Sequence, residues 1–177
     1  MPVSHPFNRK YITQIVKEYE CKTALDVGIG FGDIGAYLKK HIPQLVIDGI
    51  EIWASYIHPQ WLNYQRVWIG DFCKFPIKPI YDAILAIDVI EHLRKDTGRK
   101  QMERLMNLAQ KVFILSIPIV EYPQGAIMGN PYEIHRASWR EDEILEIGSA
   151  CASARLELLA KNEVIGVFKS CPLGGTK

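Results

Sequence analysis

The sequence predicts one α/β domain, built on a largely parallel β-sheet with helices on both faces. Short apolar runs alternate with helical segments along most of the chain, which is the pattern of strand–helix–strand units. A glycine-rich turn joins the first apolar run to the helix after it. With 177 residues, 48% of them hydrophobic, the chain has the length for a single domain (residues 1–177) with a substantial core.

The first third of the chain predicts a helix, a strand and a second helix. The first helix is expected over residues 8–20 with Asn8 as its N-cap. Its apolar residues recur at helical spacing: Tyr11, Ile12, Ile15, Val16 and Tyr19. An apolar strand at 23–27 then enters the glycine-rich turn, and the next helix shows an apolar repeat every four residues before Pro43.

The middle of the chain predicts four more strands and one helix. Residues 99–110 form the helix, with Met102, Leu105, Met106 and Ala109 on one face. The strand after it is a continuous apolar run, typical of a strand buried on both sides. The four strands are expected at residues 45–52, 67–69, 81–87 and 112–117.

The C-terminal part departs from this alternation. A helix is expected to begin near Ser138, where Ser138 and Glu141 have the spacing of a capping box. Two β-rich runs, 155–160 and 163–169, are separated by only two residues. Only a hairpin joins strands so close in sequence, so we expect an antiparallel pair at the end of the sheet.

Charge and composition exclude several classes of protein. The net charge is +1, from 21 basic and 20 acidic residues without a block of either sign, so we expect no large nucleic-acid or anionic-membrane surface. The longest apolar run, 112–120, is too short to span a bilayer, and the first residues lack the apolar segment of a secretory signal. The cysteines have no metal-ligand spacing and predict reduced thiols in a cytoplasmic protein: Cys21, Cys73, Cys151 and Cys171.

The stretch "TALDVGIGFGDIGAYL" contains two overlapping glycine motifs. Gly28, Gly30 and Gly32 give D-x-G-x-G-x-G, whereas Gly30, Gly32 and Gly35 give the dinucleotide fingerprint G-x-G-x-x-G. In both registers the glycines let the backbone turn tightly after a buried strand and let a ligand approach the main chain.

Charge separates the two registers. Asp26 precedes the glycines and Asp33 follows them, and no Lys or Arg occurs between residues 23 and 37. A pyrophosphate disfavours adjacent carboxylates, whereas a ligand that carries an ammonium and a sulfonium suits them. The first register is therefore favoured, and Gly35 is expected to be small so that its helix packs closely on the first strand.

Acidic residues also close three later strands. Glu51 lies about twenty residues beyond the glycines, where a carboxylate accepts hydrogen bonds from ribose hydroxyls of either NAD or S-adenosylmethionine. Asp71 and Phe72 together offer an acceptor for an exocyclic amine and an aromatic face, and Asp88 ends the next strand. Carboxyl ends of parallel strands meet at one edge of a sheet, so these side chains are expected to share one site.

The order of "ALDVGIGFG", "IDGIEIW", "GDF" and "YDAILAIDVIEHL" resembles the class I S-adenosylmethionine-dependent methyltransferases over about residues 22–120. The resemblance implies a Rossmann-like seven-stranded sheet in the order 3-2-1-4-5-7-6 with strand seven antiparallel, and S-adenosylmethionine as cofactor. It also implies the cofactor residues. Those for the methionine part are Asp26, Gly28, Gly30 and Gly32; those for ribose and adenine are Glu51, Ile52, Asp71 and Phe72; those near the sulfonium are Asp88, Val89 and Ile90.

Residues 118–138 are expected to cover the acceptor as a lid, because so long a loop inside a compact domain is usually functional. His135 and His92 are the candidate bases, with Glu91 as a partner, because imidazole titrates near neutrality. His92 has the alternative of bonding the backbone at a helix start, and His135 that of anchoring the loop. The aromatic residues that could form an acceptor wall, or simply pack the loop, are Tyr122, Tyr132 and Trp139.

The sequence predicts no metal site, because Glu91 with His92, or Glu133 with His135, lacks further carboxylates at ligand spacing. We therefore expect a methyltransferase that acts on O, N or C of a small-molecule acceptor. Methylation of a protein or of RNA is the alternative within the class. Outside it, a nicotinamide-dependent oxidoreductase or a non-catalytic cofactor-binding module remains open, and no pattern indicates the oligomeric state.

Overall fold

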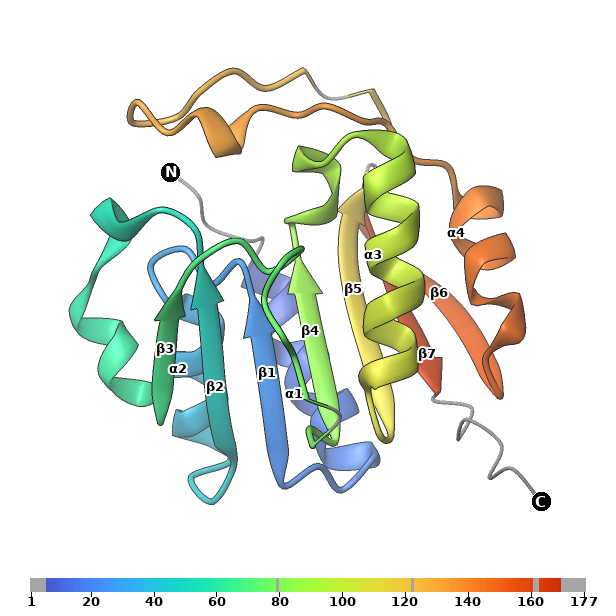
Figure 1. The fold of residues 1–177 in the computed structure, drawn as a ribbon. Helices are drawn as coiled ribbons and strands as arrows, with labels where there is room; N and C mark the ends of the chain where they lie inside the picture. Colours follow the sequence, from blue (N-terminus) through green and yellow to red (C-terminus); the bar gives the residue numbers. More distant parts are fainter. Residues whose placement is uncertain (1–5, 79, 122, 161–162, 170–177) are drawn as a thin grey trace.

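Seven strands form one sheet in the order β3-β2-β1-β4-β5-β7-β6 (Figure 1). The computed structural model describes residues 6–78, 80–121, 123–160 and 163–169. β1 to β5 run parallel, and β7 is antiparallel to both of its neighbours. The bounds are β1 Thr23–Val27, β2 Val46–Glu51, β3 Arg66–Ile69, β4 Ala83–Ile87, β5 Val112–Pro118, β6 Ser153–Ala160 and β7 Glu163–Lys169. The predicted fold class, strand order and closing antiparallel pair are confirmed.

Helices cover both faces of the sheet (Figure 1). α1 (Pro6–Glu18) and α2 (Asp33–His41) lie on one face, while α3 (Lys95–Leu108) and α4 (Glu141–Ile147) lie on the other. Five short 3-10 helices complete the described helical elements: η1 Ala54–Tyr56, η2 Pro59–Asn63, η3 Ile90–His92, η4 Pro131–Glu133 and η5 Gly148–Ala150.

The strands divide the core into two layers because successive side chains point to opposite faces. In β4, Ile84 and Ala86 pack with α3, whereas Leu85 and Ile87 pack with α1 and α2. All five residues of β4 are buried, as expected for a central parallel strand covered on both sides. Both faces of the sheet are therefore covered, and its carboxyl edge lies between the two helical layers.

Three helix starts differ from their predicted positions. α3 begins at Lys95, four residues before the predicted start at residue 99, and ends at Leu108. α1 begins at Pro6, so Asn8 is not an N-cap; its side chain is fully buried and bonds to Ser116. α4 begins at Glu141, and the Oε2 atom of Glu143, not a group at Ser138, accepts the N–H of Arg140 at 2.9 Å. The turn residues 161–162 of the predicted hairpin lie outside the described residues.

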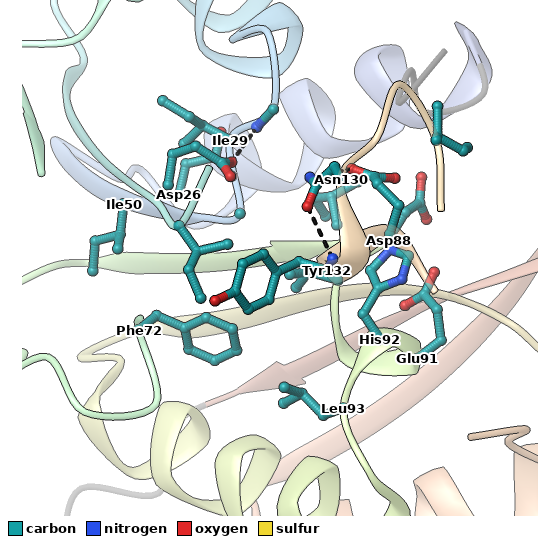
Figure 2. Close-up of a pocket in the computed structure, with 18 of the residues that line it drawn as sticks. Asp26, Ile29, Ile50, Phe72, Asp88, Glu91, His92, Leu93, Asn130 and Tyr132 are labelled. Carbon is teal, nitrogen blue, oxygen red and sulfur yellow. Dashed lines mark hydrogen bonds between the residues drawn. The ribbon is translucent and has the colours of Figure 1, made fainter. Parts of the chain in front are cut away.

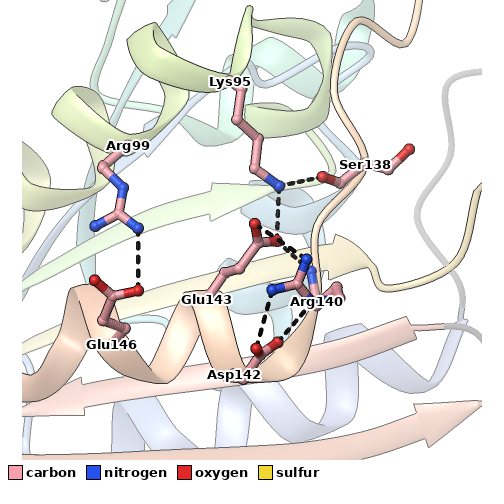
Figure 3. A network of polar contacts seen from close by, with 7 residues as sticks. All are labelled: Lys95, Arg99, Ser138, Arg140, Asp142, Glu143 and Glu146. Carbon is pink, nitrogen blue, oxygen red and sulfur yellow. Dashed lines mark hydrogen bonds and ion pairs between the residues drawn. The ribbon is translucent and has the colours of Figure 1, made fainter.

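Ion pairs join α3 to α4 (Figure 3). Lys95 Nζ lies 2.7 Å from Glu143 Oε2 and also donates to the carbonyl of Ser138, and Arg99 Nη2 lies 3.3 Å from Glu146 Oε2. Partly exposed pairs of this kind each contribute about 0–1 kcal/mol. These contacts fix the position of the chain that follows the 118–138 loop, because they attach it to α3.

None of the three described cysteines, Cys21, Cys73 and Cys151, forms a disulfide with another described residue; Cys171 lies outside that part of the chain. The helices within the described ranges are all too short or too polar to cross a bilayer.

Candidate functional site

A cavity of about 480 Å³ opens at the carboxyl edge of the sheet. It lies where β1 is flanked by β2 on one side and β4 on the other, the switch point at which open α/β sheets bind ligands. Its walls come from the ends of β1, β2 and β4, the glycine turn, η3 and the 118–138 loop. A volume of this size suits a small organic ligand.

The glycine turn has a backbone that only glycine adopts readily. Gly28, Gly30 and Gly32 have φ angles of 73°, 53° and 88°, in the left-handed region. Gly35 is not in that region and belongs to α2. The three glycines that the turn requires are thus those of the D-x-G-x-G-x-G register.

Glu51 holds the glycine turn against the end of β2. Its Oε2 atom accepts the N–H of Gly30 at 2.8 Å, and its Oε1 atom accepts the N–H of Trp53 at 2.8 Å. The side chain is buried, and that burial raises its pKa while the backbone hydrogen bonds lower it. The carboxylate therefore fixes the turn and still faces the cavity with its remaining lone pairs.

Asp26 is held from the opposite side by a buried tyrosine. The Tyr64 hydroxyl donates to Asp26 Oδ2 at 2.7 Å and accepts the N–H of Gly35 at 3.0 Å. Burial, with a further contribution from the charge of Glu51, raises the pKa of Asp26 to about 7, although the Tyr64 hydrogen bond opposes the shift. Asp26 therefore changes its charge near neutral pH.

Gly35 is small because of Tyr64, not because of the first strand as the sequence suggested. A Cβ atom on Gly35 would overlap the end of the Tyr64 ring, including its hydroxyl. Tyr64 is buried and belongs to the connection between η2 and β3. The fourth glycine of the motif thus supports the side chain that positions Asp26.

The apolar end of the cavity is formed by Ile50, Ile52 and Phe72, with Asp71 beside them. Asp71 Oδ1 accepts the N–H of Cys73 at 2.9 Å, which fixes the turn after β3. In Figure 2, Ile50 and Phe72 lie on one side of the cavity, while Asp88, Glu91 and His92 gather on the other. We call the part of the cavity where Asp88, Glu91 and His92 gather its acidic end, although carboxylates also occur elsewhere in the lining.

Asp88 follows β4 with a φ of 53°, a conformation that Asp tolerates better than most residues. Its N–H donates to the carbonyl of Ser116 at 3.0 Å. The Ser116 hydroxyl lies 2.6 Å from Asp88 Oδ1 and 2.6 Å from Glu163 Oε1, and it has a single proton to donate. Asn8 Nδ2 donates to the Ser116 hydroxyl at 3.1 Å, so residues of α1, β5 and β7 together position Asp88.

Glu91, His92 and His135 meet at the acidic end. The rings of His92 and His135 lie 4.9 Å apart edge to face, and one ligating atom of each of the three residues lies within 4.8 Å of the others. Burial, followed by the charge of Asp88, raises the pKa of Glu91 well above its usual range. Burial lowers the pKa of His92 to about 4, with His135 adding to the shift, so His92 is a neutral imidazole at pH 7.

The 118–138 loop crosses above the carboxyl edge of the sheet (Figure 1). A backbone hydrogen bond joins the two halves of the loop: the N–H of His135 donates to the carbonyl of Gln124 at 3.1 Å. The N–H groups of Arg136 and Ala137 donate to the carbonyl of Glu91 at 2.9 and 3.1 Å, which places His135 beside His92. In η4, just before His135, Glu133 Oε1 accepts a hydrogen bond from the hydroxyl of Tyr56 at 3.0 Å.

Most of the predicted site residues line the cavity: Asp26, Gly28, Gly30, Glu51, Ile52, Asp71, Phe72, Asp88, Val89, Glu91, His92 and His135. Gly32 and Ile90 do not; a Cβ atom on Gly32 would face Trp61, and Ile90 is fully buried in the core. Tyr132 lines the cavity, whereas Trp139 packs in the core beneath Lys95. Tyr122 lies outside the described residues.

The sequence analysis did not single out three residues that shape the site. Tyr64, Ser116 and Glu163 each contact a lining residue or line the cavity themselves. Ser116 is a polar interruption in an otherwise apolar strand, which was an available signal. The three residues predicted as bases and partner, His135, His92 and Glu91, do lie together, because the loop brings His135 back from 43 residues away.

The charged side chains among the described residues that line the cavity are almost exclusively acidic. Eight carboxylates line the cavity, and none of the described lining residues is Lys or Arg. The carboxylates belong to Asp26, Asp33, Glu51, Asp71, Asp88, Glu91, Glu133 and Glu163. Such a site favours a ligand with positive charge and disfavours a pyrophosphate.

No protein-family model matches the chain, and no curated protein matches it in sequence. Solved structures do match its fold. The methyltransferase domain of the bacterial protein CtHen1-C superposes with a TM-score of 0.69 at 20% identity, covering 93% of this chain and 98% of that one. The chain has the fold of the class I S-adenosylmethionine-dependent methyltransferases.

Two further structures with this methyltransferase fold contain a ligand. Magnesium protoporphyrin IX methyltransferase from Synechocystis PCC 6803, with bound S-adenosylhomocysteine, matches with a TM-score of 0.68 at 15% identity, covering 93% of this chain and 82% of that one. The 1,6-didemethyltoxoflavin-N1-methyltransferase of Burkholderia thailandensis, with 1,6-didemethyltoxoflavin and S-adenosylhomocysteine bound, matches with a TM-score of 0.67 at 15% identity, covering 92% of this chain and 77% of that one. At these identities the likeness establishes the fold alone.

We predict that Gly35→Ala destabilises the protein. Alanine gains about 1 kcal/mol over glycine in a helix, but overpacking a rigid, hydrogen-bonded Tyr64 ring costs about 1–3 kcal/mol. Urea unfolding is expected to show a net loss for Gly35→Ala. Gly125→Ala is the matched control, because its added Cβ meets no atom within 4 Å. A Gly35→Ala variant as stable as the wild type would contradict the Tyr64 packing.

Proposed function

We propose that the chain is an S-adenosylmethionine-dependent methyltransferase that transfers a methyl group to O, N or C of a small-molecule acceptor. The observation that carries this proposal is the cavity at the switch point, with eight carboxylates and no Lys or Arg among its described lining residues. S-adenosylmethionine brings an ammonium and a sulfonium to such a site, whereas NAD brings a pyrophosphate.

The cofactor is assigned to the part of the cavity between the glycine turn and Phe72. Asp26 and the glycine turn hold the methionine part, Glu51 accepts from the ribose hydroxyls, and Asp71 with Phe72 takes the adenine. In support, hydrogen bonds within the protein fix the carboxylates of Glu51 and Asp26 at the cavity wall. Side chains that the protein itself holds in place lose less free energy in ordering on binding.

The acceptor is assigned to the acidic end. Methyl transfer is an in-line displacement, so the acceptor atom must lie beyond the methyl group and opposite the departing sulfur. Glu91, His92 and His135 line the cavity and lie close together. Figure 2 shows Glu91 and His92 on the side of the cavity away from Phe72. We assign these three residues to binding the acceptor and to controlling the proton that it loses.

A small-molecule acceptor is supported by the 118–138 loop, which lies above the carboxyl edge of the sheet and contributes Gln124, Tyr132 and His135 to the cavity lining. Two structures of the same fold are named for small substrates, magnesium protoporphyrin IX and 1,6-didemethyltoxoflavin. The chain's balanced charge gives no separate support to a nucleic-acid acceptor.

Titration calorimetry with S-adenosylhomocysteine and with NADH tests the proposed function. We expect saturable binding of S-adenosylhomocysteine and none of NADH. The reverse result would make the chain a nicotinamide-dependent protein. A labelled methyl donor incubated with a panel of hydroxylated, aminated and carbon-acid small molecules then separates an enzyme from a binding module, because a module would bind the cofactor and transfer no methyl to any of them.

The affinity for S-adenosylhomocysteine is expected to rise with pH through about pH 7. The pKa of Asp26 is raised to about 7, so the ionised form that attracts the ammonium is lost as pH falls below that value. From pH 8 to pH 6 the affinity should fall about tenfold. Asp26→Asn keeps an acceptor for the Tyr64 hydroxyl and should lack most of this slope. An equal slope in both proteins would exclude Asp26 as its origin.

The loop is proposed to act as a lid over the acceptor. Backbone amides of residues 123–135 should exchange hydrogen more slowly when S-adenosylhomocysteine is bound, because the bound ligand contacts lining residues such as Gln124 and Tyr132. Amides of α3 provide the internal reference. Exchange in the loop that is unaffected by saturating ligand would contradict a closing role.

A further inference from the structure

We propose that Glu91, His92 and His135 form a binding site for a divalent transition-metal ion at the acceptor end of the cavity. The ligating atoms of the three residues all lie within 4.8 Å of one another, and all three residues line the cavity. This inference rests on the proposed function for its role in catalysis, but the cation site itself stands on the geometry of these side chains.

Two of the ligating groups are buried and unsatisfied. Glu91 is 2% exposed, and its Oε2 atom has no hydrogen-bond partner among the described residues; the same holds for the buried Nδ1 atom of His92. Buried polar atoms are nearly always hydrogen-bonded, so two unpaired polar atoms in one cluster require an explanation. A cation that Glu91 and His92 ligate provides one.

The surroundings favour positive charge. Asp88, Glu133 and Glu163 line the cavity together with Glu91, and none of the described lining residues is Lys or Arg to balance them. A divalent ion would offset this charge and would draw the three ligating atoms to about 2.0–2.2 Å from the metal.

The set of donors selects the kind of ion. Two imidazole nitrogens and one carboxylate oxygen suit Mn²⁺, Fe²⁺, Co²⁺ or Zn²⁺ better than Mg²⁺ or Ca²⁺, which prefer oxygen ligands throughout. Three protein ligands leave coordination positions open, and all three ligands line the cavity. The open positions would bind a hydroxyl oxygen of the acceptor.

The chemical consequence is an activated oxygen nucleophile. A hydroxyl bound to a divalent ion loses its proton to water more readily than a free one. The oxygen then attacks the methyl carbon: the O–C bond forms, the C–S bond breaks, and its electron pair remains on sulfur as S-adenosylhomocysteine. The metal thus favours O-methylation among the acceptor atoms that the proposed function leaves open.

Calorimetry with MnCl₂ on metal-stripped protein tests this site, with Co²⁺ absorption as a second measurement of the ligand set. We expect one Mn²⁺ per chain in the wild type. Glu91→Gln and His135→Ala should each bind at least about tenfold more weakly. His41→Ala is the control, because His41 is exposed and lies outside the cavity lining; it should bind like the wild type.

Affinity for S-adenosylhomocysteine is measured on every variant in parallel, so that the two proposals fail separately. A wild-type protein that binds S-adenosylhomocysteine but neither Mn²⁺ nor Co²⁺ would overturn the metal site and leave the proposed function intact. Unchanged Mn²⁺ affinity in both Glu91→Gln and His135→Ala would also overturn it. Mn²⁺ binding that both substitutions weaken, with S-adenosylhomocysteine affinity retained, would support it.

Discussion

Burial of acidic side chains at one edge of the sheet is the constraint on which the rest of the site depends. Parallel strands end at the same edge, and here β1, β2 and β4 place Asp26, Glu51 and Asp88 there or one residue beyond it. Asp26 and Glu51 are buried and Asp88 is partly buried, and a carboxylate removed from water needs hydrogen bonds. The donors are the Tyr64 hydroxyl, the N–H groups of Gly30 and Trp53, and the Ser116 hydroxyl. The glycine turn, the connection between η2 and β3, and β5 are thereby joined at one cavity.

The fold was predictable because its signals are local and repeated. Apolar runs and helical spacing marked all seven strands and four helices to within a few residues, and two short β-rich runs marked the closing antiparallel pair. Helix starts were less predictable. Asparagine is a favoured N-cap residue, but the side chain of Asn8 instead makes a buried hydrogen bond to Ser116. Local preference gives way there to a tertiary hydrogen bond over 108 residues.

The site was predictable where it follows the strand ends and not where it depends on packing. Asp26, Glu51, Asp71 and Asp88 lie at element boundaries that the sequence shows. Tyr64 lies in an irregular connection, where no periodicity indicates which way a side chain points. His135 reaches His92 only because the loop returns and donates two hydrogen bonds to the carbonyl of Glu91. Contacts of that kind are set by loop geometry, for which the sequence contains no period.

The position of β7 between β5 and β6 affects the order in which the molecule can be completed. Among the described strands, β6 pairs only with β7. β6 precedes β7 along the chain, so it cannot join the sheet until β7 has paired with β5. β7 also brings Glu163 to the Ser116 hydroxyl beside Asp88. During synthesis, the parallel half can form as it emerges, but the acidic end of the cavity stays unfinished until the last strand has left the ribosome.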